Sequence, residues 1–149
     1  MKVYLAADHR GFEMKTELLE WLESSGHEVT DLGPKKYVKS DDYPDYGFAL
    51  GEKVASEPGS FGIGICGSGV GMVISANKVP GVRAGQARDP EIAAVGRSDD
   101  NTNILILSSD YIELADAKKV VEMWLATEFA GEDRFKRRID KISSYEAGR

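Results

Sequence analysis

The most informative stretch of this chain is Phe61-Gly-Ile-Gly-Ile-Cys66-Gly-Ser-Gly-Val-Gly71-Met72. Isoleucines that alternate with glycines are typical of a short strand buried on both faces. The glycines after Cys66 allow positive φ angles and a close approach of the backbone to a ligand. Residues 72–78 have helical spacing, and a helix N-terminus favours an anion and lowers the pKa of a nearby thiol. Cys66 is therefore either a thiolate beside an oxyanion site or a small buried cysteine at a strand end.

Strand-like and helix-like segments alternate on either side of this stretch, which predicts a parallel α/β sheet with helices on both faces. Strands are expected at residues 3–7, 28–32, 61–66, 82–87 and 103–107. Helices are expected around residues 12–22, 46–54, 72–77, 90–95 and 114–125, followed by a basic tail helix after Gly131. The prediction is one domain over residues 1–149 with a five-stranded parallel sheet.

The composition excludes several classes of partner. A net charge of −6 argues against nucleic acid, because phosphate backbones are bound by clustered Lys and Arg. The single cysteine excludes an internal disulfide, which fits a reducing compartment. The first strand-like run meets Asp8 too early for a signal peptide or a membrane span. We expect a cytoplasmic protein with neither nucleic acid nor membrane as its partner.

The order of the strands decides where a ligand binds. In a sheet ordered 2-1-3-4-5, the order reverses between the first and third strands, and ligands bind beyond the carboxyl ends there. The first strand ends in Asp8 and His9, and the third ends in Cys66 and Ser68. Taken singly, Asp8 would be a helix cap and His9 an exposed imidazole. Their expected convergence with Cys66 favours a site.

The glycine loop lacks the features of cofactor motifs. It reads G-x-G-x-G, with Met72 where the dinucleotide fingerprint has its third glycine, and it has no Gly-Lys-Ser/Thr of a Walker loop. His9, His27 and Cys66 do not have metal-ligand spacing. The sequence predicts a site that uses neither a metal nor a cofactor.

Taken together, the motifs of the chain resemble those of the ribose-5-phosphate isomerase B family, which also includes galactose-6-phosphate isomerase subunits. The motifs are Asp8-His9, Asp42-Tyr43-Pro44, Cys66-Gly-Ser-Gly-Val-Gly71, Ala76-Asn77-Lys78, Gly81-Val-Arg83-Ala84 and the basic tail. The resemblance implies a Rossmann-like α/β/α fold and a cofactor-free interconversion of an aldose phosphate and a ketose phosphate, as in ribose 5-phosphate to ribulose 5-phosphate. It also implies a homodimer, or a tetramer, with active sites shared between subunits.

The resemblance assigns the proton transfer to the glycine loop. Cys66 stands at the position of the base that moves a proton between neighbouring carbons through an enediolate. The oxyanion of that intermediate needs hydrogen-bond donors that are already in place. The donors implied are the Ser68 hydroxyl and the backbone N–H groups of Gly67, Ser68, Gly69, Val70 and Gly71.

Other residues are assigned to the sugar and its phosphate. Asp8 matches the residue that assists opening of the sugar ring, and His9 matches a phosphate contact. Arg134 and Arg138, four residues apart, would share a helix face and clamp the phosphate, or else belong to a solvated tail helix. Tyr43 would border the pocket or pack within its own turn.

The chain departs from the family pattern in four places. Asp99 and Asp100 stand where the family has a ring-opening histidine and a ligand-contacting asparagine. A carboxylic acid with a raised pKa could move a proton in place of histidine, and turn residues before a strand are the alternative. Asp110 stands where an arginine commonly reaches the phosphate, and Phe135 replaces a histidine that often follows the first tail arginine.

These departures leave two enzyme hypotheses and one of another class. Either the aspartates point away and Arg10, Arg88 or Arg97 supplies the positive charge, or the substrate is a different sugar phosphate, such as a hexose or a modified sugar. A non-catalytic sugar-phosphate sensor on the same fold is the alternative. A thiol-redox module is disfavoured because no second cysteine could resolve an oxidised Cys66.

Overall fold

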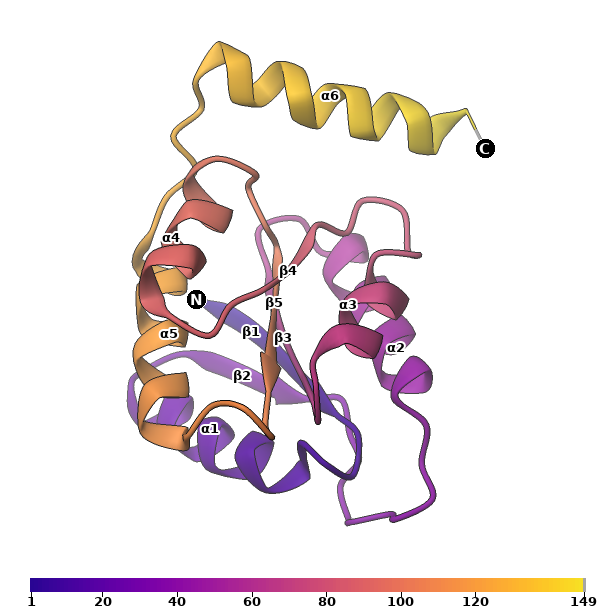
Figure 1. Cartoon of the computed structure of the whole chain (residues 1–149), viewed down its shortest axis with the longest axis vertical. Helices are drawn as coiled ribbons and strands as arrows, with labels where there is room; N and C mark the ends of the chain where they lie inside the picture. Colours follow the sequence, from indigo (N-terminus) through magenta and orange to yellow (C-terminus); the bar gives the residue numbers. More distant parts are fainter. Residues whose placement is uncertain (149) are drawn as a thin grey trace.

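A five-stranded parallel sheet with helices on both faces forms the body of the computed structural model, which describes residues 1–148 (Figure 1). The strands are β1 (Lys2–Ala7), β2 (Glu28–Asp31), β3 (Phe61–Cys66), β4 (Ala84–Gln86) and β5 (Ile104–Ser108). The helices are α1 (Phe12–Ser24), α2 (Tyr43–Ser56), α3 (Val70–Ala76), α4 (Pro90–Ser98), α5 (Leu114–Ala126) and α6 (Asp133–Ala147). The predicted α/β class, the parallel sheet and the C-terminal helix are confirmed.

The strands lie in the order β2-β1-β3-β5-β4, so the expected order 2-1-3-4-5 is wrong for the last two. All five residues of β5 are buried, which suits a central position in a parallel sheet. β4 has three residues, all partly exposed, which suits an edge. The strand order does reverse between β1 and β3, which is where the sequence predicts that a ligand binds.

Two helices begin earlier than the hydrophobic pattern predicts. α2 starts at Tyr43 rather than at residue 46, because Pro44 lies in the first turn, where its missing N–H group costs nothing. α3 starts at Val70 rather than at residue 72, directly after Gly69, whose φ of 83° ends the loop. Both changes lengthen helices that border the glycine loop.

The two faces of β3 are packed differently. Ile63 and Ile65 belong to a core that also contains residues of α1, α4 and α5. On the other face, a Cβ atom at Gly64 would lie 2.6 Å from Ile106 Cδ1 and 3.0 Å from Met72 Cγ. α2 and α3 therefore pack close to the sheet, on the face to which Cys66 also belongs.

Helix α6 lies apart from the two helical layers, across the end of the sheet where the strands begin (Figure 1). The Ala130 N–H before it donates to the Ser98 carbonyl at 3.0 Å. Near its other end, Glu146 accepts from the Gly81 N–H at 3.0 Å. Ser98 and Gly81 precede β5 and β4, so α6 lies at the opposite end of the sheet from Cys66. In the described part of the chain, every helix is too short or too polar to cross a membrane.

Truncation of the Leu50 side chain tests how closely helix α2 packs on strand β3. Leu50 is fully buried, and a Cβ atom at Gly62 or Gly64 would lie 3.1 Å from its methyl carbons. Leu50→Ala is expected to lower the free energy of unfolding by about 2–5 kcal/mol, measured by chemical denaturation. The control Glu52→Ala, exposed on the same helix, should change it by less than about 0.5 kcal/mol. Equal losses in both variants would contradict the packing described.

Candidate active site

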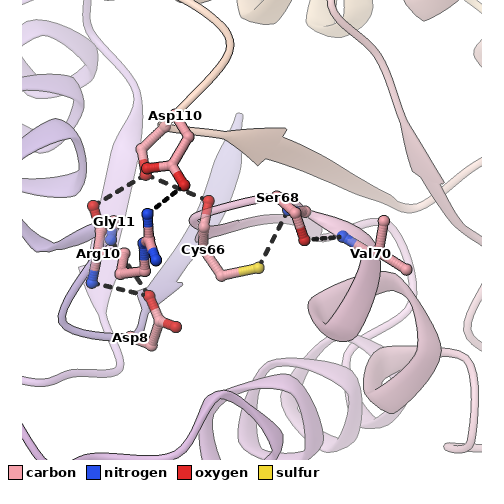
Figure 2. A network of polar contacts seen from close by, with 9 residues as sticks. Asp8, Arg10, Gly11, Cys66, Ser68, Val70 and Asp110 are labelled. Atoms are coloured by element: carbon pink, nitrogen blue, oxygen red, sulfur yellow. Dashed lines mark hydrogen bonds and ion pairs between the residues drawn. The ribbon is translucent and has the colours of Figure 1, made fainter.

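The carboxyl ends of β1, β3 and β5 meet at one edge of the sheet and bring three loops together (Figure 2). The Asp8 N–H donates to the Ile65 carbonyl at 3.2 Å, which joins the loop after β1 to β3. The Ser109 N–H donates to the Cys66 carbonyl at 3.0 Å, which joins the loop after β5 to the same place. The expected convergence of Asp8 with Cys66 is therefore seen.

Cys66 is a buried thiol held by the glycine loop. Its side chain points toward that loop, and the Gly69 N–H donates to Sγ at 3.2 Å (Figure 2). Burial raises the pKa of Cys66 above that of an ordinary thiol, and the charge of Asp8 raises it further. The N–H groups of Met72 and Gly69 act in the opposite direction but do not outweigh burial. The N–H groups at the start of the helix lower this pKa as expected, but the net shift is upward.

Asp8 is buried, and its carboxyl group lies near the side chain of Cys66 (Figure 2). Its Oδ1 accepts hydrogen bonds from the N–H groups of Arg10 at 3.0 Å and Gly11 at 3.2 Å. Burial raises the pKa of Asp8, although these two hydrogen bonds favour the ionised form. Asp8 thus fixes the start of α1 and also offers an acid of raised pKa next to Cys66.

His9 is held by a carboxylate that the sequence did not single out. Its Nδ1 lies 2.8 Å from Asp41 Oδ1, and the same oxygen accepts from the His9 N–H at 2.9 Å. These contacts fix the ring and leave Nε2 for another partner. Acidic residues crowd the segment before Tyr43, but which of them folds back depends on the path of residues 33–42, for which the sequence holds no local signal.

Tyr43 and Gln86 border the glycine loop. A Cβ atom at Gly71 would lie 2.6 Å from ring carbons of Tyr43, so the ring packs directly on the loop. The Gln86 side chain donates to the Ser68 carbonyl at 2.8 Å from the end of β4. The Ser68 hydroxyl is exposed and accepts from the Val70 N–H at 3.3 Å. Gln86 was missed because a lone polar residue at the end of an edge strand has no distinctive pattern.

Asp110 forms an ion pair with Arg10 beside the loop (Figure 2). Its N–H donates to the Gly67 carbonyl at 3.0 Å, and a Cβ atom at Gly67 would lie 2.5 Å from Arg10 Nε. Of the three arginines considered as replacements, Arg10 is the one at this edge that pairs with Asp110. Arg88 instead stacks on an aromatic ring at 4.7 Å, and Arg97 is buried near the other end of the sheet.

The remaining predicted residues lie at the opposite end of the sheet. Asp99 and Asp100 follow α4 and precede β5, and Asp99 accepts from the Ser98 hydroxyl at 2.6 Å. Arg134 and Arg138 lie on α6 across that same end (Figure 1). We call Asp8, His9, Tyr43 and residues 66–71 the loop group, and Asp99, Asp100, Arg134 and Arg138 the tail group. One copy of the chain does not bring the two groups together.

The loop group has the components for moving a proton between neighbouring atoms. It combines a thiol and a carboxyl group of raised pKa with backbone N–H groups that can hold a developing negative charge. Within residues 1–148, no three His, Cys, Asp or Glu side chains are arranged to hold a metal ion.

Comparisons with known proteins agree on one family. A family model described as ribose/galactose isomerase matches residues 3–142. The probable ribose-5-phosphate isomerase B of Mycoplasma pneumoniae is 40% identical over 97% of this chain and 94% of that protein. The ribose-5-phosphate isomerase B of Mycobacterium tuberculosis is 38% identical over 98% of this chain and 90% of that protein.

Solved structures give the same result. The ribose-5-phosphate isomerase B of Mycoplasma genitalium, with bound ribulose-5-phosphate, has a TM-score of 0.94 and 40% identity. It covers 98% of this chain and 96% of its own. The enzyme of Clostridium thermocellum has a TM-score of 0.95 and 38% identity, covering 99% of both chains.

The pH dependence of thiol alkylation tests the surroundings of Cys66. Because burial and Asp8 raise its pKa, the rate with iodoacetamide should rise with pH and show an apparent pKa above that of free cysteine. Asp8→Asn should shift that pKa downward, since the variant lacks the neighbouring negative charge. An apparent pKa below that of free cysteine, or no shift in Asp8→Asn, would contradict this description.

Proposed function

This chain belongs to the ribose/galactose isomerase family, and we propose that it interconverts ribose 5-phosphate and ribulose 5-phosphate without a cofactor. The observation that carries the proposal is the Cys66 thiol, buried beside Asp8 and within hydrogen-bond reach of the glycine loop. Two relatives are named as ribose-5-phosphate isomerase B, and a solved structure of a third contains ribulose-5-phosphate. The similarity to all three extends over nearly the whole chain.

The proposed reaction begins with opening of the sugar ring. Asp8, whose pKa is raised by burial, gives a proton to the ring oxygen while the C1 hydroxyl loses its own proton to solvent, so that the C1–O bond of the ring breaks and the aldehyde is freed. The Cys66 thiolate then takes the proton from C2 and returns it to C1. The C1 oxygen gains a proton and becomes a hydroxyl group, while the C2 hydroxyl loses its proton and becomes the carbonyl. The N–H groups of residues 67–71 hold the negative charge of the enediolate.

The tail group has the proposed role of completing the site. Arg134 and Arg138 would hold the phosphate together with His9, and Asp99 would take part in ring opening in place of the family's histidine. Asp100 would contact the sugar. The carboxylates of Asp99 and Asp100 would accept hydrogen bonds from hydroxyl groups of the sugar.

We propose a homodimer in which each active site combines the loop group of one copy with the tail group of the other. Two observations support it. The two groups lie at opposite ends of the sheet within one chain, and large apolar side chains are exposed on three helices. These side chains are Val70 and Ile74 on α3, Ile92 and Val95 on α4, and Ile142 on α6. A cytoplasmic location suits the free thiol.

Substitution of Cys66 tests the proposed base. Cys66→Ala is expected to lower kcat for ribose 5-phosphate by about 100-fold or more and to abolish deuterium uptake from solvent at the substrate carbon. Calorimetry on the same variant should still detect substrate binding. Unchanged deuterium uptake would contradict the role of Cys66. Binding without turnover by the wild-type chain, across pentose and hexose phosphates, would instead indicate a sensor.

Mixing two inactive variants tests the shared site. Cys66→Ala and the double variant Arg134→Gln/Arg138→Gln should each lose most activity. After equal amounts are unfolded and refolded together, about one quarter of the sites should contain both intact groups and recover activity. Absence of recovery, with mixed dimers verified by differently tagged chains, would contradict sharing.

A further inference from the structure

A cavity of about 370 Å³ lies far from Cys66, at the end of the sheet where β3, β4 and β5 begin. Two arginines, Arg83 and Arg97, line it together with the side chains of Ser60, Asn101 and Asn103. Among the described residues that line the cavity, none is acidic. Two cations are therefore gathered in a hollow whose walls carry neutral polar groups.

Arg97 is buried and has neutral hydrogen-bond partners. Its Nη1 donates to the Thr102 carbonyl at 2.6 Å and to Asn101 Oδ1 at 2.9 Å. Its guanidinium group lies 4.9 Å from the centre of the Phe61 ring. These contacts satisfy Nη1 and fix the plane of the side chain, but among residues 1–148 they leave its positive charge without a counter-ion.

Arg83 lies close enough for its charge to act on Arg97. Its Nε donates to the Asn101 carbonyl at 2.8 Å, so both guanidinium groups contact the same residue. Burial lowers the pKa of Arg83, and burial together with the charge of Arg83 lowers the pKa of Arg97. Two like charges held near each other with partial desolvation are stabilised by an anion between them.

One carboxylate stands at the edge of this cavity. Glu146 on α6 accepts from the N–H group of Gly81, which lines the cavity, and its charge acts on Arg83. Figure 1 shows the C-terminal end of α6 above the loop between α3 and β4, to which Gly81 belongs. Glu146 thus uses a donor that an entering anion would need, and it supplies part of the missing negative charge.

We propose that the cavity between Arg83 and Arg97 binds a phosphate group in competition with Glu146. The planar fork of a guanidinium group matches the oxygens of phosphate, and the side-chain amide of Asn101 adds a neutral donor. The volume is sufficient for inorganic phosphate or for the phosphate of a small ester. Within one copy of the chain, this site is separate from the loop group, which lies at the other end of the sheet.

Amide chemical shifts of the full-length, isotope-labelled chain test the proposal during titration with inorganic phosphate. The signals of Gly81, Asn101 and Asn103 should shift with their own concentration dependence, independent of residues 67–71. Arg83→Gln should weaken that response about tenfold or more and leave the glycine loop response unchanged. Shifts confined to residues 67–71 would overturn the proposal. A parallel titration with ribose 5-phosphate distinguishes free phosphate from a phosphate ester.

Removing the competing carboxylate gives the opposite change. Glu146→Gln should strengthen the response at Gly81 and Asn101 about threefold, because the variant no longer supplies a negative charge there. Asp140→Asn is the matched control, since it removes one exposed negative charge from the same helix. It should have no effect. Equal changes in both variants, or no change in Glu146→Gln, would overturn the proposal even if Arg83→Gln failed to fold.

Discussion

The distance between β3 and the two helices α2 and α3 is the constraint on which the site depends. Glycine at positions 62 and 64 leaves room for Leu50, Met72 and Ile106, whose atoms would lie within 3.1 Å of a Cβ atom at one of these two positions. Cys66 belongs to the same face of the strand, two residues further along. The close approach therefore sets the first turn of α3 over the thiol and brings the Gly69 N–H to Sγ.

The same burial gives the site its acid–base character. Desolvation is the main cause that raises the pKa of both Cys66 and Asp8, because burial disfavours the charged form of each group. A raised pKa makes the carboxyl group of Asp8 better suited to carry and donate a proton to a ring oxygen. A neutral Cys66 must lose its proton before it can act as a base, and the N–H groups around it stabilise the thiolate once it forms.

Local patterns predicted the elements, and long-range packing decided the rest. The alternation in residues 61–66 gave β3 with its bounds, and the strand ends at Asp8 and Cys66 gave the loop group. The exchange of β4 and β5 was not predicted, because it depends on the burial of whole strands. Asp41 and Gln86 reach the site through contacts distant in sequence. The sequence does contain a signal that Asp99 lies far from Cys66 within one chain. A residue just before a parallel strand lies at the amino end of the sheet, whereas Cys66 ends its strand.

A crystal structure of the chain with bound ribulose 5-phosphate would show whether one active site is built from the loop group of one copy and the tail group of another. We predict that C1 and C2 of the sugar lie next to Cys66 Sγ, with the phosphate between Arg134 and Arg138 of a second copy. A ligand whose reacting carbons lie away from Cys66, or whose two ends are both held by a single copy, would contradict it.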